Sequence, residues 1–280
     1  MEFIEILKAI FFGIVEGITE WLPVSSTGHM ILFEEFLKLD VSEDFFEMFL
    51  VVIQLGAILA VPILFFDKLN PFSRKKSAEE RKMTYSLWGK VIVGVLPAAV
   101  IGLLLDDILD TYFYNFITVA VALIVYGVAF ILIEKCISGK REPRVKDVHE
   151  LTYKDAAFIG AFQMLSLIPG TSRSGSTILG AMVGGVSRNA GAEFSFFMAI
   201  PVMLGASLLK IVKFAVSGTA VSGGEIGLLL IGMAVSFVVS LATIKFLMNF
   251  VKRHDFSIFG VYRIILGALL IGYFIFNYVI

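Results

Sequence analysis

Cysteine and charged residues are both scarce in this sequence. Cys136 is the single cysteine, so an intrachain disulfide is excluded, and only 17% of the residues are charged. The formal net charge of −1 offers no basic surface for nucleic acid, and no nucleic-acid partner is expected. The first residues include Glu2 and Glu5 and lack the basic segment and cleavage site of a signal peptide, so we expect them to belong to the mature fold.

Apolar residues dominate the rest of the sequence. They make up 58% of the 280 positions, and the mean hydropathy is +0.90, which is too high for a soluble domain of ordinary composition. Windows of about 20 residues, enough to cross the hydrocarbon core, occur at 45–66, 87–105, 116–133, 194–214, 226–251 and 258–280. We therefore predict an all-α polytopic membrane protein, a single integral membrane domain over residues 1–280 with six transmembrane helices.

Two further regions, at about residues 1–39 and 151–187, are apolar but interrupted. Each contains a cluster of Pro, Gly and Ser, in the similar segments EGITEWLPVSSTGH (16–29) and QMLSLIPGTSRSG (163–175). This pattern predicts two half-length helices in each region, arranged as a re-entrant helical hairpin. Irregular backbone at membrane depth is tolerated only inside protein or beside a water-filled cavity, so the two tips should face each other or a cavity.

The distribution of basic residues predicts the topology. Lysine and arginine concentrate in the loops at 67–90 and 134–155, which are therefore expected in the cytoplasm and leave both termini outside. The first hairpin then enters from the outer face and the second from the cytoplasm, so residues 1–135 and 151–280 form an inverted-topology repeat. Such repeats build substrate sites at their interface near the bilayer midplane.

Glu16 and Glu20 lie four positions apart in the first hairpin, which puts both carboxylates on one helix face. Magnesium and calcium are bound by oxygen ligands, often one or two carboxylates plus substrate phosphate, so this pair is a candidate cation site. The alternative is that one glutamate caps a helix or pairs with Arg173.

The two polar turns also suit an anion. Each supplies hydroxyls and a helix N-terminus, where free backbone N–H groups and the helix dipole favour negative charge. The second turn adds Arg173, whose planar donor fork matches phosphate. Helix capping explains the individual hydroxyls equally well. The candidate phosphate ligands in these turns are Ser25, Ser26, Thr27, Ser172, Arg173 and Ser174.

His29 is the one histidine placed in a predicted membrane segment, three positions after Ser26. It can act as acid, base or nucleophile near neutral pH, and Ser26 is the hydroxyl best placed as nucleophile or phosphate ligand. Arginine, metal and hydroxyl together fit phosphoryl transfer. Three other charged residues near helix ends are interpreted as anchors or buried ion-pair partners, namely Arg188, Glu193 and Arg263.

Several motifs strongly resemble the bacterial undecaprenyl pyrophosphate phosphatase family, also called bacitracin-resistance proteins. They are EGITEWLPVSSTGH at 16–29, VIQLGAILAV at 52–61, LPAAVIGLLLDD at 96–107, PGTSRSG at 169–175 and EFSFFMAIPVMLGA at 193–206. The resemblance covers essentially the whole chain. It implies an inner-membrane enzyme that removes the terminal phosphate of undecaprenyl diphosphate, which recycles the lipid carrier for peptidoglycan synthesis and confers bacitracin resistance.

The resemblance also implies roles for particular residues. Glu16 and Glu20 match the family's glutamates associated with Mg²⁺ or Ca²⁺, Ser26 and His29 match its hydroxyl and histidine, and Arg173 matches its diphosphate-binding arginine. Ser172, Ser174 and Thr177 would support that arginine. The expected catalytic set is Ser26, His29, Glu20 and Arg173, in a site open to the outer face.

Some alternatives stay open at this point. The nucleophile is Ser26, His29 or water, and the oligomeric state is undetermined, with a homodimer as one alternative. A polyprenyl-phosphate transporter or flippase with the same midplane anion site is the rival function, because an inverted repeat with midplane hairpins is typical of transporters.

Overall fold

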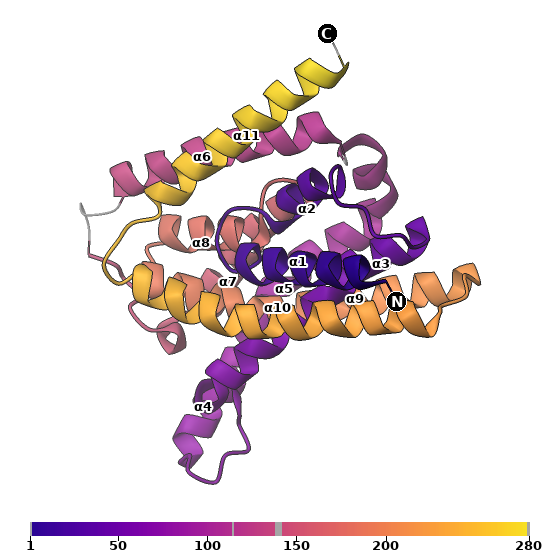
Figure 1. Cartoon of the computed structure of the whole chain (residues 1–280). Coiled ribbons are helices and arrows are strands. Elements are labelled where there is room, and N and C mark those ends of the chain that lie inside the picture. The colour runs from indigo at the N-terminus through magenta and orange to yellow at the C-terminus, as the bar shows by residue number, and fades with distance from the viewer. Residues whose placement is uncertain (1, 114, 138–141, 279–280) are drawn as a thin grey trace.

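Helices provide all the regular secondary structure in the part of the chain that the computed structural model describes, residues 2–113, 115–137 and 142–278. The first half of the chain contains α1 (Phe3–Thr19), α2 (Ser26–Glu34), α3 (Glu43–Leu64), α4 (Phe66–Leu69), α5 (Ala78–Phe113) and α6 (Phe116–Ile137). The second half contains η1 (Val148–Glu150), α7 (Tyr153–Gln163), η2 (Met164–Leu167), α8 (Arg173–Val183), α9 (Arg188–Ser217), α10 (Gly223–Phe250) and α11 (Ser257–Tyr278). Figure 1 shows the chain from end to end.

The prediction of six membrane-spanning helices is confirmed. Six helices are long and apolar enough to cross a membrane, over Glu43–Leu64, Ala78–Leu105, Phe116–Cys136, Arg188–Ser217, Gly223–Phe250 and Ser257–Phe276. Polar caps explain where several of them begin. Ser42 and Ser187 accept hydrogen bonds from the first turns of α3 and α9, and Ser222 forms a capping box with Glu225 at the start of α10.

The apolar surface of these helices faces outward. In the six candidate spans, between 28% and 50% of the residues of each window are buried inside the protein. Large side chains such as Leu104, at 72% exposed, and Val216, at 82%, therefore lie on the outside of the bundle. A surface of this composition is stable in lipid rather than in water, and the chain is a multi-pass membrane protein.

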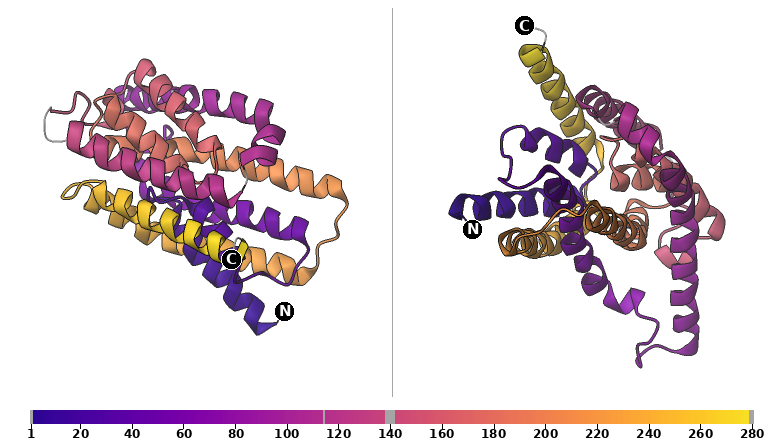
Figure 2. Two further views of the ribbon diagram at one scale, coloured as in Figure 1. Left: turned by 90° about the horizontal axis from the view of Figure 1, so that it is seen from above. Right: turned by 90° about the vertical axis from the view of Figure 1, so that its right-hand side faces the viewer.

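Glycine residues allow the helices to pack closely at several crossings. A Cβ at Gly56 on α3 would lie 2.0 Å from the Met233 carbonyl oxygen of α10, and one at Gly160 on α7 would lie 2.3 Å from the Gly94 carbonyl oxygen of α5. Small residues at these crossings let backbones approach each other, which drives association where lipid removes the hydrophobic effect between helices. Figures 1 and 2 show the resulting arrangement, with α6 and α11 side by side and α1 running along α10.

The short helices α2 and α8 lie in the middle of this bundle, each preceded by one of the two polar turns (Figure 1). Around them, buried ion pairs tie the long helices together. Arg188 donates to Glu134 at 2.6 and 2.9 Å, and Lys68 donates to Glu193 at 2.8 Å. The interpretation of Arg188 and Glu193 as ion-pair partners is therefore confirmed. Of the basic loop at 134–155, Lys140 and Arg141 lie outside the described residues.

Candidate active site

The two polar turns end in matching serines. Ser25 caps α2 and accepts a hydrogen bond from the Gly28 N–H at 3.2 Å, and Ser172 caps α8 and accepts one from the Gly175 N–H at 3.1 Å. Among the described residues, these two are the non-glycine positions with positive φ, 72° and 70°. Such backbone costs about 1–3 kcal/mol and persists where surrounding structure enforces it, often at functional sites.

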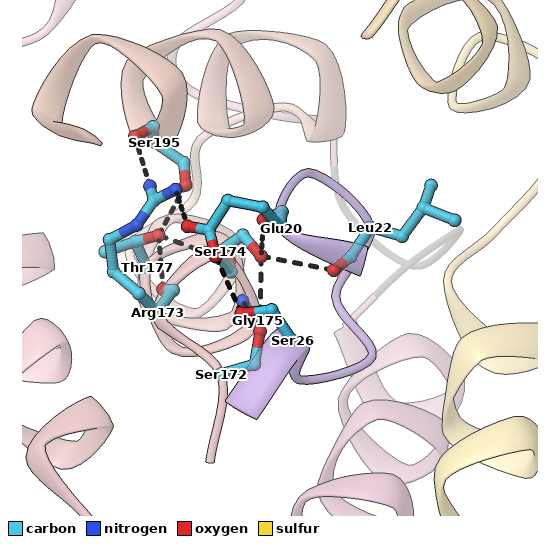
Figure 3. A network of polar contacts seen from close by, with 9 residues as sticks. All are labelled: Glu20, Leu22, Ser26, Ser172, Arg173, Ser174, Gly175, Thr177 and Ser195. Carbon is cyan, nitrogen blue, oxygen red and sulfur yellow. Dashed lines mark hydrogen bonds and ion pairs between the residues drawn. The ribbon is translucent and has the colours of Figure 1, made fainter. Parts of the chain in front are cut away.

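Glu20 joins the two turns. Its Oε1 accepts a hydrogen bond from Arg173 Nη2 at 2.8 Å, and its Oε2 accepts one from the Ser26 hydroxyl at 2.7 Å (Figure 3). The Glu20 and Arg173 side chains are 9% and 10% exposed, so the ion pair is screened little by water. The structure thus brings together three of the four predicted catalytic residues, and the expected alternative of a glutamate pairing with Arg173 is confirmed for Glu20.

Ser174 reinforces the junction from the second turn. Its hydroxyl is hydrogen-bonded to the carbonyl oxygens of Glu20 at 3.1 Å and Leu22 at 3.3 Å, and it lies 3.2 Å from the Ser172 hydroxyl. Figure 3 shows these contacts between turns that are far apart in the sequence. The N-termini of α2 and α8 therefore approach each other at the Glu20–Arg173 pair.

Helix α9 holds Arg173 in place through hydrogen bonds. Arg173 Nη1 donates to the Ser195 carbonyl oxygen at 2.9 Å, and the Ser195 hydroxyl lies 2.6 Å from that of Thr177. The guanidinium also lies 5.9 Å from the centre of the Trp21 ring. Ser195 was not predicted as a site residue, although a serine within the apolar run at 194–200 was an available signal.

Three buried polar atoms beside this pair have no hydrogen-bond partner among the described residues. They are Arg173 Nε, Trp21 Nε1 and Glu16 Oε1. Unsatisfied buried polar groups are rare and costly, so a bound ligand or an ordered water is expected to satisfy them. Two of the three are donors, which an anion with several oxygens could satisfy.

Glu16 lies one turn before Glu20 on α1 and is 1% exposed. No group of three His, Cys, Asp or Glu side chains that could hold a metal occurs in the described residues. A site for Mg²⁺ needs fewer, because the ion keeps several waters and takes its remaining ligands from one or two carboxylates and substrate phosphate. Glu16, with an unpartnered carboxylate oxygen, and Glu20 fit that donor set.

His29 belongs to a second cluster. Its Nδ1 lies 2.7 Å from the Ser25 carbonyl oxygen and its Nε2 lies 2.6 Å from the Tyr262 hydroxyl, with the two rings parallel within 5°. A carbonyl oxygen only accepts, so in the neutral ring Nδ1 carries the proton and Nε2 accepts from Tyr262. Both ring nitrogens of His29 are therefore engaged away from the Glu20–Arg173 pair.

Arg263 connects the backbones of the two turns. Its guanidinium is fully buried and donates to the carbonyl oxygens of Pro23 at 3.1 Å and of Gly170 and Thr171 at 2.8 Å each. The interpretation of Arg263 as an anchor or ion-pair partner is corrected here, because its hydrogen-bond partners are backbone carbonyls that precede the two strained serines. No pattern in the sequence indicates this role.

Thr27 completes the set of predicted residues. Its side chain is half-buried in the first turn of α2 and makes no hydrogen bond within the described part of the chain. Its hydroxyl is therefore available to a ligand, whereas Ser25 and Ser172 already cap their helices.

Comparison with known proteins identifies the family to which this chain belongs. The family model of the bacitracin resistance protein BacA matches residues 9–269. A protein of Enterococcus faecalis named undecaprenyl-diphosphatase is 60% identical over 277 residues, covering 99% of this chain and 100% of the relative. Proteins of the same name from Streptococcus mutans and Acetivibrio thermocellus are each 58% identical, covering 98% and 97% of this chain and 97% and 98% of their own lengths. The chain belongs to the bacitracin resistance protein BacA family.

Proposed function

We propose that this protein hydrolyses undecaprenyl diphosphate to undecaprenyl phosphate and inorganic phosphate. The reaction would recycle the lipid carrier of peptidoglycan synthesis and, by lowering the amount of diphosphate that bacitracin can bind, confer resistance. The relatives are named for this reaction and are similar to this chain over nearly its full length, which supports the substrate. The observation that carries the chemistry is a buried arginine and a serine hydroxyl held on one carboxylate, between two helix N-termini.

Binding of the diphosphate would use groups that are already oriented. Arg173 would exchange its bond to Glu20 for the more highly charged phosphate, and its free Nε–H would gain an acceptor. The N-termini of α2 and α8 would add backbone N–H groups and the positive ends of two helix dipoles. Ser172, Ser174 and Thr177 would hold the second turn in place, while the prenyl chain stays in lipid.

Ser26 is the nucleophile that the geometry supports best. Its hydroxyl proton already points at Glu20 Oε2, 2.7 Å away, so Glu20 could accept that proton as Ser26 Oγ attacks the terminal phosphorus. A bond from Ser26 Oγ to phosphorus would form, the bridging P–O bond would break, and undecaprenyl phosphate would leave. Glu20 would pass the Ser26 proton to the departing phosphate and return to its carboxylate form. It would then take a proton from the water that attacks the phosphoserine and give that proton to the Ser26 oxygen as the Ser26 Oγ–phosphorus bond breaks.

His29 is the alternative. Its Nε2 would have to release Tyr262 before it could attack phosphorus or take a proton from water. In either case catalysis rests mainly on neutralising the charge of the phosphoryl group, which Arg173 and the helix N-termini provide.

A divalent cation, Mg²⁺ or Ca²⁺, would be held by Glu16 and Glu20 together with substrate oxygens. It would supply additional neutralisation of the diphosphate charge. The buried Glu16 oxygen that has no partner among the described residues supports this assignment.

An inverted repeat would account for the site's composition. In the proposed repeat, α1 and α2 correspond to α7 and α8, and the matching strained caps Ser25 and Ser172 support this correspondence. The packing of α1 on α10 likewise matches that of α7 on α5. Each pair of short helices would be a re-entrant hairpin, one from each side of the membrane. One chain supplies both turns, so this site does not require a homodimer.

The basic loops at 67–90 and 134–155 would then face the cytoplasm, with both termini and the opening of the site on the outer side.

Phosphate release from undecaprenyl diphosphate tests this function directly. The purified protein in detergent is expected to release inorganic phosphate with added Mg²⁺ or Ca²⁺, and EDTA is expected to abolish the release, with restoration by the cation. Release that persists unchanged in EDTA would remove the metal from the proposal.

A lipid transporter is the second candidate, favoured by the paired short helices at the centre of the fold. A transporter would move a fluorescent polyprenyl phosphate across proteoliposomes without releasing phosphate from the diphosphate. Transport without hydrolysis would replace the proposed enzymatic function.

A further inference from the structure

A cavity lies apart from the two polar turns. It has a volume of about 450 Å³ and lies between the end of α3, the short helix α4, the first turns of α9 and the last turns of α10. None of the predicted catalytic, phosphate-binding or metal-binding residues lines it. Its location at the ends of three candidate membrane helices places it at a membrane boundary rather than in the middle of the bundle.

Positive charge predominates in this cavity. Three lysines line it, Lys68, Lys245 and Lys252, against one carboxylate, Glu193. Lys68 is neutralised, because it donates to both Glu193 oxygens at 2.8 Å and lies 3.9 Å from Asp147.

Lys245 and Lys252 make no direct ion pair or hydrogen bond through their ammonium groups within the described residues, although Lys252 attracts Glu193 from a greater distance. Their two positive charges therefore remain for a ligand, and both side chains are exposed enough to reach one.

The other wall of the cavity is apolar. Leu64 and Phe65 come from the α3–α4 junction, and Ile244 and Met248 come from α10. A cavity with a cationic rim and an apolar wall matches a phosphate group attached to a hydrocarbon better than a free, fully hydrated phosphate. Basic pockets between membrane helices on the cytoplasmic side are sites where anionic lipid headgroups bind.

We propose that this cavity binds the headgroup phosphate of an anionic membrane phospholipid, with Lys245 and Lys252 as its ligands and the apolar wall against the adjoining hydrocarbon. The site faces the cytoplasmic leaflet on the topology proposed above. It is connected to the active site through α9, since Glu193 precedes by two positions the Ser195 whose carbonyl oxygen holds Arg173.

Native mass spectrometry of the purified protein in a neutral detergent tests this proposal. The probe is a short-chain phosphatidylglycerol, with phosphatidylcholine of the same chain length as the headgroup control. The wild type is expected to bind phosphatidylglycerol in preference. The double variant Lys245→Gln/Lys252→Gln is expected to weaken that binding by about tenfold or more, because each lysine near such a headgroup contributes about 1 kcal/mol.

A matched variant controls for the loss of surface charge. Lys75→Gln/Lys82→Gln removes two exposed lysines from the loop before α5 and its first turns, on the same predicted side of the membrane. It is expected to bind the lipid as the wild type does. The variant Lys245→Arg/Lys252→Arg keeps the charge and is expected to retain binding, which separates a loss of ligands from a loss of folding.

Three outcomes would overturn the proposal. Wild-type binding by the double glutamine variant would mean that the two lysines only extend toward the membrane surface. An equal loss of binding in both glutamine variants would indicate general attraction to the protein surface. Displacement of the lipid by an equal concentration of inorganic phosphate would assign the site to the free ion. Phosphate release by the double glutamine variant is expected to stay close to that of the wild type.

Discussion

Glu20 is the residue on which the two halves of the site converge. One carboxylate oxygen is bonded to Arg173 and the other to Ser26, while the backbone oxygen of the same residue accepts from Ser174. Because the pair with Arg173 is largely buried, loss of either partner would leave a charge that water cannot solvate well. In the proposed mechanism the diphosphate replaces Glu20 as the partner of Arg173, and a divalent cation held by Glu16 and Glu20 would balance the carboxylate that is left.

The identity of the nucleophile can be tested at single residues. Ser26→Ala is expected to reduce phosphate release by about 100-fold or more. Removal of the nucleophile should lower the rate at least as much as the loss of one hydrogen bond to the transition state. Tyr262→Phe keeps the ring stacked on His29 and removes only the hydroxyl on Nε2. It is expected to change the rate by less than about tenfold, a smaller effect than loss of a general acid or base.

The two rates are measured as phosphate release under identical conditions. Phosphate release by Ser26→Ala close to the wild-type rate would exclude Ser26 and transfer the nucleophilic role to His29 or water.

At the scale of elements, the starts of α2 and α8 carry backbone strain. Ser25 and Ser172 hold φ values of 72° and 70° at the N-cap, where Ser187 of α9 has an ordinary value of −62°. Arg263 binds the carbonyl oxygens just before both strained serines, so the strain is enforced from α11. The strained turns orient the N-termini of α2 and α8 toward the same pair of side chains, Glu20 and Arg173.

Glycine replacements measure this strain. Ser25→Ala loses the cap and keeps the strained φ, whereas Ser25→Gly loses the cap and relieves the strain, which is worth about 1–3 kcal/mol. The thermal midpoint of Ser25→Gly in detergent is therefore expected to exceed that of Ser25→Ala. The same pair of changes at Ser187 is the control and should give a smaller difference. Equal differences at the two positions would mean that Ser25 is not strained.

The stability that Asp155 contributes at the start of α7 is expected to depend on pH. Burial alone would raise the pKa of Asp155, but hydrogen bonds from Arg144 and Thr152 outweigh it and hold the pKa below its usual value. A carboxyl group whose folded pKa is lowered contributes stability that is complete above its unfolded pKa, about 3.9, and is lost as the pH falls through the folded value.

Thermal unfolding at a series of pH values checks this. The difference in midpoint between the wild type and Asp155→Asn is expected to be constant near neutral pH and to shrink below about pH 4. A difference that persists unchanged in acid would exclude the ionised carboxylate as its cause.

For the whole molecule, the sequence predicted the spans well because lipid imposes a simple requirement. A helix such as α6 or α10 must be apolar over about 20 residues, and that run is visible without any tertiary information. The polar turns were equally visible, because Glu20, Ser26 and Arg173 interrupt apolar segments.

The supporting contacts were not predictable in the same way. Arg263 reaches carbonyl oxygens 92 to 240 positions away, and Tyr262 reaches His29 across 233 positions. Backbone carbonyls carry no side-chain signal in the sequence, so no local pattern could identify these partners. An ion pair with Arg173 and a cation site on Glu16 and Glu20 were the two interpretations of these carboxylates, and only the tertiary structure could show that the ion pair forms.

The rate of phosphate release by Arg173→Ala and Glu20→Ala, measured on purified protein with undecaprenyl diphosphate and a divalent cation, tests the central claim most directly. Both variants are expected to lose essentially all turnover, because Arg173 is the proposed ligand of the diphosphate and Glu20 is the proposed base. Preserved thermal unfolding would show that the loss is chemical. Turnover close to the wild-type rate in either variant would contradict the assignment of this site.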